Sequence, residues 1–142
     1  AHLVGLLGAD PRLLAEAGAQ RPRGVVSLDA GALNVPTLMS QRRVPTLYRD
    51  AFGDDRRDWL AASPYHRLDR GALPMLLVCA SARRFPASPC DEGRAFVKKA
   101  ATLGITMQLL PEPMDHGEIN RNLGLPSDYT ATVARYVDGL LR

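Results

Sequence analysis

One histidine occupies a position suited to a general base. His116 lies in the segment 114–117 (Met-Asp-His-Gly), shortly after an apolar run at 105–110. If that run is a strand, the imidazole stands at the carboxyl end of the strand, beside a glycine that permits a tight turn. An imidazole titrates near neutral pH, so it can accept a proton from a nucleophile and return it to a leaving group. His116 is therefore the first candidate for chemistry in this chain.

The elements that would position His116 follow from the apolar pattern. Short apolar runs at 24–28, 74–80 and 105–110 predict buried strands of a parallel sheet. Helical patterns precede, separate and follow these runs, at 1–9, 12–19, 90–103 and 127–141. Alternating strands and helices are typical of the α/β class. We expect residues 1–142 to form part of one α/β domain, with three parallel strands and flanking helices.

The sequence predicts which side chains of two helices are buried. The helix at 1–9 is apolar nearly all round, which is typical of a buried helix. The helix at 127–141 is amphipathic, and its spacing predicts an inward face made of Thr130, Val133, Ala134, Val137 and Leu141. Three strands make a thin sheet with few helices to cover it. We therefore expect more strands on a segment that precedes Ala1.

The stretch 29–73 contains no strand signal. Short helical pieces are expected at 38–41, 46–52 and 58–62, and Ser63-Pro64 is expected to end the last of them. In α/β domains such an excursion tends to lie near the carboxyl ends of the strands, where ligands bind. We expect it to lie near the active site.

Composition and charge exclude several classes of function. The net charge is only +3 and the arginines are interleaved with aspartates, a pattern unlike a nucleic-acid-binding surface. No apolar run approaches the ~18 residues of a membrane-spanning helix. Two cysteines, Cys79 and Cys90, form no metal-binding pattern, and a disulfide between them is left open. No metal and no organic cofactor is expected.

Four segments, in order, resemble the second half of an α/β-hydrolase. The family is the esterases and lipases, of the kynurenine-formamidase and microbial carboxylesterase kind. Residues 1–3 (Ala-His-Leu) resemble the start of the helix that follows the Gly-x-Ser-x-Gly nucleophile elbow. Residues 62–64 resemble the family's Ser-Pro turn, 74–79 resemble its penultimate strand, and 115–120 with the closing helix resemble its histidine loop and last helix. The resemblance covers essentially the whole chain.

The resemblance implies a serine carboxylesterase acting on small esters or amides. His116 would be the general base, and the nucleophilic serine would lie about three residues before Ala1 if the elbow pattern holds. Both donors of the oxyanion hole would also lie on this preceding segment. The chain would thus need the N-terminal segment of the same protein as its partner, and on its own it would not run the reaction.

Two residues are candidates for the acid of the triad. The family usually carries its acid in the loop after the penultimate strand, where this sequence has Arg83. Asp29, directly after the strand at 24–28, is the first substitute, because some lipases of the fold place the acid at that neighbouring strand end. Asp91 is the alternative acid, although it also suits the acidic first turn of a helix.

Two other functions compete with hydrolysis. A non-catalytic α/β domain that binds a small ligand or a protein partner is favoured by Arg83 in the usual place of the acid. A complete small flavodoxin-like domain is disfavoured, because a first strand and a phosphate-binding loop are missing.

Overall fold

The structure is a computed structural model that describes residues 1–142. A fully buried strand forms its centre. This strand, β2 (Met75–Ala80), is buried at all six positions. It pairs in parallel with β1 (Val25–Leu28) on one side and with β3 (Met107–Glu112) on the other. The sheet order is therefore β1-β2-β3, and the predicted α/β fold with three parallel strands is confirmed.

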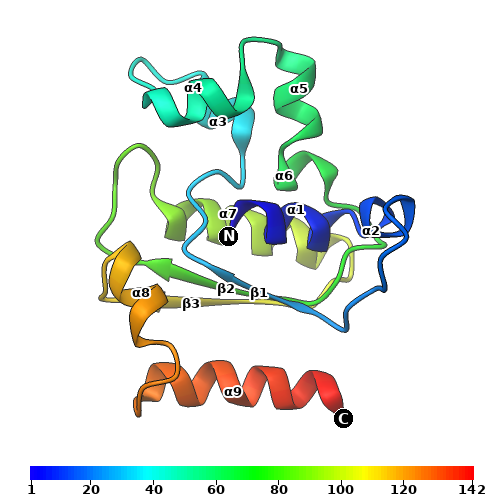
Figure 1. The fold of residues 1–142 in the computed structure, drawn as a ribbon, viewed down its shortest axis with the longest axis vertical. Coiled ribbons are helices and arrows are strands. Elements are labelled where there is room, and N and C mark those ends of the chain that lie inside the picture. Colours follow the sequence, from blue (N-terminus) through cyan, green and yellow to red (C-terminus); the bar gives the residue numbers. More distant parts are fainter.

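Helices cover both faces of the sheet (Figure 1). On one face, α1 (His2–Ala9) and α7 (Pro89–Thr102) pack over the strands, with α2 (Arg12–Glu16) beside them. On the other face lies α9 (Asp128–Leu141), and α8 (His116–Asn122) stands at the carboxyl ends of the strands, with Ile119 in the apolar cluster of that face. Alternate residues of β2 serve the two layers, since Met75 and Leu77 join one apolar cluster and Leu76 and Val78 join the other.

The excursion between β1 and β2 forms a small helical layer at the top of Figure 1. Its helices are α3 (Val35–Met39), α4 (Thr46–Phe52), α5 (Arg56–Ala61) and α6 (Pro64–Arg67). The layer has its own apolar cluster, made of Ala32, Val35, Leu38, Met39 and Ala87, against which Val44, Tyr48, Phe52 and Trp59 pack. As expected, the excursion contains no strand.

The excursion's helix boundaries differ from the sequence prediction in two places. The first helix begins at Val35 rather than residue 38, because the Asn34 side chain accepts a hydrogen bond from Thr37 N and caps it. Pro64 begins the short helix α6 as well as ending the preceding one, since a proline fits the first turn of a helix.

The expected burial of the first and last helices was partly wrong. In α1, Leu3 is 69% exposed and Val4 is exposed as well, so only one face of this helix is covered within the chain. In α9 the inward side chains include Tyr129 and Val133, whereas Val137 and Leu141 are exposed. A helical turn of 3.6 residues allows both faces to fit the apolar pattern, and the packing of Tyr129 decides between them. No helix of the chain is both long enough and apolar enough to span a bilayer.

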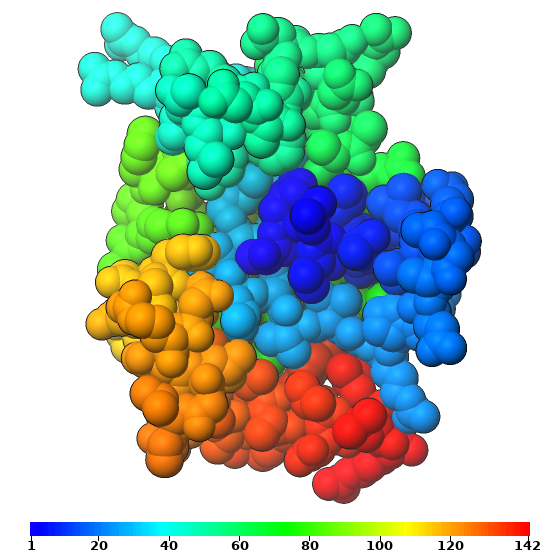
Figure 2. All heavy atoms as spheres, viewed as in Figure 1, coloured from blue at the N-terminus to red at the C-terminus, as the bar shows by residue number.

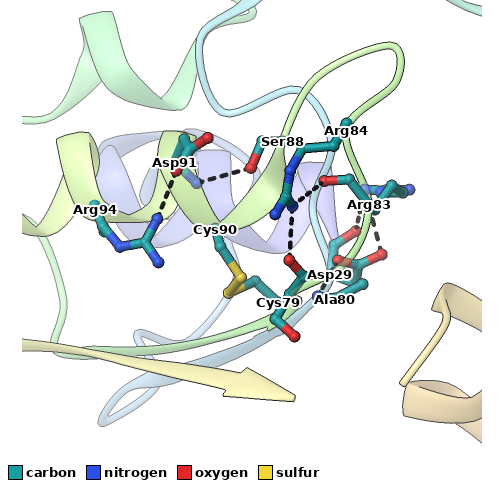
Figure 3. The surroundings of a disulfide bond; sticks show 10 residues. Asp29, Cys79, Ala80, Arg83, Arg84, Ser88, Cys90, Asp91 and Arg94 are labelled. Carbon is teal, nitrogen blue, oxygen red and sulfur yellow. Dashed lines mark hydrogen bonds and ion pairs between the residues drawn. A yellow bond between two sulfur atoms is a disulfide. The ribbon is translucent and has the colours of Figure 1, made fainter. Parts of the chain in front are cut away.

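Cys79 and Cys90 form a disulfide that joins the end of β2 to the start of α7 (Figure 3). Their Cα atoms are 5.2 Å apart, within the usual range for a bridge. We expect replacement of both cysteines by alanine to lower the free energy of unfolding by about 2–3 kcal/mol, because the short covalent ring restricts the unfolded chain. Thermal unfolding with and without a thiol reductant measures this. The double variant serves as its own control, because the reductant should no longer change its melting temperature.

A second stabilising feature is a buried carboxylate that joins α1, α2 and α6. Asp10 is fully buried, accepts hydrogen bonds from Arg12 Nε at 2.7 Å and Nη2 at 3.1 Å, and also pairs with Arg67. The hydrogen bonds from Arg12, and then those from Arg67, hold the pKa of Asp10 below its ordinary value. A lowered pKa in the folded state means that this stabilisation is present above the pKa of an unfolded aspartate. It is lost as the pH falls through the folded value.

We therefore expect Asp10→Asn to lower the free energy of unfolding at neutral pH by about 2 kcal/mol. This is less than for a fully buried pair, because the Arg12 guanidinium stays in contact with water. The variant should also lose less stability than the natural protein when the pH is lowered from about 6 to about 3. Urea titrations at several pH values test both points. Asp91→Asn, which breaks an exposed ion pair with Arg94, should change stability by less than about 1 kcal/mol.

Candidate active site

Asp29 lies directly after β1 and turns its carboxylate across the end of β2. Its backbone N–H still donates to Val78 O at 2.8 Å, which continues the ladder by one residue. Its φ is +57°, a left-handed conformation that aspartate tolerates better than most residues. The side chain is fully buried, and Oδ1 accepts a hydrogen bond from Ala80 N at 2.8 Å. This backbone bond fixes the carboxylate at the carboxyl edge of the sheet.

His116 meets the other oxygen of this carboxylate. Its Nδ1 lies 3.0 Å from Asp29 Oδ2, and its side chain is 58% exposed. With Nδ1–H donating to a carboxylate, Nε2 is the nitrogen that can accept a proton from a third group. The sequence thus places an acid and a base at the ends of two non-adjacent strands, and the fold brings them into hydrogen-bond contact.

The position of His116 is fixed by a helix start that the sequence analysis did not predict. The segment 115–120 was expected to be the histidine loop, but α8 begins at His116 itself. Asp115 Oδ1 accepts from Glu118 N and Glu118 Oε2 accepts from Asp115 N, both at 2.8 Å, so the two form a capping box. The Asp-x-x-Glu spacing was the signal that could have shown this helix start. Gly117 leaves room for the Arg121 guanidinium, which a β-carbon there would meet at 2.5 Å.

Arg83, in the loop after β2, also binds Asp29. Its Nη2 lies 3.2 Å from Asp29 Oδ2 and donates to Asp29 O at 3.3 Å (Figure 3). The side chain is only 25% exposed, whereas the neighbouring Arg84 is exposed and donates to Ser81 O and Arg83 O. The sequence analysis noted Arg83 at the usual place of the acid but did not predict its contact with Asp29.

Asp91, the alternative acid, does not lie with His116. It occupies the first turn of α7, its side chain is 69% exposed, and its Oδ1 pairs with Arg94 Nη1 at 2.5 Å. In Figure 3 its carboxylate is directed along the helix toward Arg94 and not toward Asp29. Of the two candidate acids, only Asp29 lies within hydrogen-bond distance of the imidazole.

The other two histidines have structural partners. His2 Nδ1 lies 2.9 Å from Ala32 O, and burial lowers the pKa of this imidazole. His66 Nδ1 lies 2.9 Å from Ser63 Oγ, which in turn bonds to the backbone of Leu33 and Val35. His116 is thus the histidine of this chain whose ring contacts a carboxylate.

The segment that follows Asp29 is held by a half-buried carboxylate of α7. Glu92 Oε2 accepts hydrogen bonds from Leu33 N at 2.7 Å and from Asn34 N at 3.4 Å, and burial raises the pKa of Glu92. A β-carbon on Gly31 would lie 2.8 Å from Arg83 Nη2 and 3.0 Å from Tyr48 Oη. Glycine at position 31 therefore lets the guanidinium and the phenol approach the backbone beside the Asp29–His116 pair.

A pocket of about 320 Å³ opens beside the imidazole. It lies between the loop after β2 and the loop after β3, and its lining includes Arg83, Met114, Asp115 and His116. A larger cavity, about 570 Å³, is lined by Pro11, Arg12, Arg21 and Asp69 among others, at the amino ends of the strands. The smaller pocket is the candidate substrate site, because its lining includes the carboxylate-bound imidazole. No group of three or more potential metal-ligating side chains occurs in residues 1–142.

Comparison with known proteins supports the fold. No protein-family model matches the chain, and no curated protein matches it either. Among solved structures, it is similar to the native form of a thermophilic esterase, Est2, from the Planctomycetes species Thermogutta terrifontis, with a TM-score of 0.66 and 21% sequence identity. The match covers 99% of this chain and 50% of the esterase, so the chain spans about half the length of that protein. The chain therefore has an α/β fold, with a three-stranded parallel sheet and flanking helices, that matches half of an esterase structure.

Proposed function

We propose that this chain supplies the base and the acid of a serine hydrolase that cleaves small carboxylic esters or amides. The observation that carries the proposal is the 3.0 Å contact between His116 Nδ1 and the fully buried Asp29 carboxylate. In such a pair the carboxylate holds the imidazole tautomer and stabilises the imidazolium that forms during reaction. Nε2 takes the proton from a serine hydroxyl and later gives it to the leaving alcohol or amine.

The nucleophilic serine, in this proposal, lies a few residues before Ala1. Two contacts place the start of α1 beside the carboxyl end of β1, where Asp29 lies. Ala1 O accepts a hydrogen bond from Ser27 Oγ at 3.3 Å, and the His2 ring lies 2.9 Å from Ala32 O. In Figure 2 the first residues of the chain and the α8 segment lie on the same face of the molecule. A hydroxyl just before Ala1 would therefore approach His116 without rearrangement of the sheet.

The same preceding segment would complete the sheet. β1 is an edge strand, and because Val25 N and Asp29 N donate to β2, the backbone groups of Val26 and Leu28 face away from it. An apolar groove of about 280 Å³ lies beside this edge, between α1, α2 and the strand, with Val4, Leu7, Leu14 and Val25 in its lining. A strand added at this edge would pair the free backbone groups and cover the exposed apolar face of α1. Backbone amides in the loops of the same preceding segment would also supply the oxyanion hole that ester cleavage needs.

Labelling with a fluorophosphonate tests this proposal. The probe phosphonylates a serine only when a positioned base activates its hydroxyl. The protein that includes the segment before Ala1 should be labelled and should hydrolyse p-nitrophenyl acetate. Residues 1–142 alone should do neither. Mass spectrometry of the labelled peptide should find the phosphonyl group on a serine that precedes Ala1. A label on any serine of residues 1–142 would contradict the proposal.

The second candidate function is a non-catalytic domain that binds a small ligand or a protein partner. The Arg83–Asp29 ion pair favours it, because a guanidinium on the same oxygen as His116 reduces the negative charge available to an imidazolium. The labelling experiment separates the two candidates. A well-folded longer protein that takes no label and hydrolyses no ester would reject the catalytic role and leave the binding role as the candidate.

A further inference from the structure

Three segments of the chain meet at one oxygen atom. Asp29 Oδ2, at the end of β1, lies 3.0 Å from His116 Nδ1, at the start of α8. The same atom lies 3.2 Å from Arg83 Nη2, in the loop after β2. A fully buried carboxylate is thus shared by a fixed cation and a titratable ring, while its other oxygen is bound by Ala80 N.

We propose that Arg83 is a positioning residue of this site. It holds the Asp29 carboxylate in place and sets the charge that the His116 imidazole encounters. The consequence for catalysis rests on the proposed function, whereas the consequence for the imidazole is a property of residues 1–142 themselves.

The placement of Arg83 is not that of an ordinary surface arginine. Its Nη2 contacts both Asp29 Oδ2 and Asp29 O. The guanidinium therefore binds the side chain and the backbone of Asp29, whose φ is positive. Its Nε is buried without a hydrogen-bond partner, a cost that solvent exposure would remove. The Nε–H of Arg83 thus loses its hydrogen bond to water. In return, the guanidinium neutralises a carboxylate that burial would otherwise destabilise.

The charges around the ring determine the direction of the effect. Asp29 and Asp115 contribute negative charge from the end of β1 and from the residue preceding α8. Arg83 contributes positive charge from the loop after β2, and Arg121 of α8 contributes positive charge beside Gly117. Glu118 of α8 adds a further negative charge next to Asp115. Glu92 of α7 and Tyr48 of α4 interact with the Arg83 charge as well. Removing the Arg83 charge leaves a net negative surrounding, which favours the protonated ring. Arg83 therefore offsets part of the negative charge that the His116 imidazole encounters.

The test uses NMR titration of the imidazole signals in residues 1–142. The chain has three histidines, so the His116 signal is assigned by its loss in His116→Ala. In Arg83→Met, the midpoint of the His116 titration should move to higher pH by roughly two units, the size expected for a unit charge about 6 Å away at an effective dielectric constant near 20. Arg83→Lys should restore most of the natural midpoint. Arg84→Met removes the same charge one residue further along and should leave the midpoint almost unchanged.

An unchanged midpoint in Arg83→Met would overturn the inference, and so would an equal shift in Arg84→Met. The amide spectrum and melting temperature of each variant show whether it is folded. If Arg83→Met does not fold, Arg83→Gln, which retains a side-chain amide near Asp29 without the charge, gives the same comparison.

Kinetics of the longer protein separate this inference from the proposed function. In Arg83→Met, the acid limb of the pH dependence of kcat/KM should move upward by the same interval as the NMR midpoint, with a smaller change on the alkaline plateau. A shifted NMR midpoint in a longer protein that never hydrolyses esters would reject the proposed function and leave the positioning role standing. Hydrolysis whose acid limb does not move in Arg83→Met would reject the positioning role and leave the proposed function standing.

Discussion

His116→Ala, in the protein that includes the segment before Ala1, should lower kcat for p-nitrophenyl acetate on the order of 10⁴- to 10⁶-fold. The loss is this large because the serine hydroxyl has no other base to accept its proton, and members of a triad act as a unit. KM should change little, since the ring contributes mainly to the transition state. Steady-state kinetics with a stopped-time assay for the slow variant measures both constants.

His66→Ala is the matched control for this experiment. Like His116→Ala, it removes an exposed imidazole that bonds to a neighbouring polar group. That group is the Ser63 hydroxyl, which accepts a hydrogen bond from Val35 N at the start of α3. We expect its kcat to stay within a few-fold of the natural value. Comparable losses in the two variants would indicate a general effect on folding, and undiminished turnover in His116→Ala would remove this residue from the mechanism.

Asp29→Asn should lower kcat by about 10⁴-fold at neutral pH, with the fold retained. An asparagine at position 29 can keep the hydrogen bond from Ala80 N, but its side-chain amide can donate to Nδ1. The imidazole then carries its proton on Nε2, the nitrogen that must accept one from the serine. The tautomer change is visible directly in residues 1–142, because the two ring nitrogens of His116 have distinct ¹⁵N chemical shifts when the ring is neutral.

Asp91→Asn provides the control for the acid. Asp91 lies in the first turn of α7 and pairs with Arg94, so its amide variant should keep kcat within about twofold. A large loss in Asp91→Asn together with a small one in Asp29→Asn would assign the acid to the other carboxylate. Retained activity in both variants would mean that neither aspartate serves His116.

Much of the sheet follows directly from the sequence. The uninterrupted apolar run before Cys79 predicts β2, because a strand covered on both faces needs apolar residues at every position. The carboxyl ends of parallel strands share one edge of the sheet, and this is why a residue after β1 and a residue after β3 were both expected there. The contact between Asp29 and His116 was thus foreseeable from strand order, although their functional roles remain a proposal.

The features that escaped prediction depend on loop geometry and on side-chain packing. The third strand begins at Met107, two residues later than expected, because Ile105 N still donates to Ala100 O at the end of α7. Arg83 and Arg84 are equivalent in sequence, and only the path of the loop after β2 brings one of them to Asp29. Pairing of the two cysteines likewise required the Cα separation that only the structure supplies.

The ring closed by the Cys79–Cys90 bond encloses the whole segment that carries Arg83. Within it, Arg84 is exposed and Phe85 is 61% exposed, which makes the bond between them accessible to trypsin. A cut there in the oxidised protein would add one water to the mass without separating the two pieces, and the pieces would part only after reduction. A nicked chain of this kind would run as intact on a non-reducing gel and as two fragments on a reducing one.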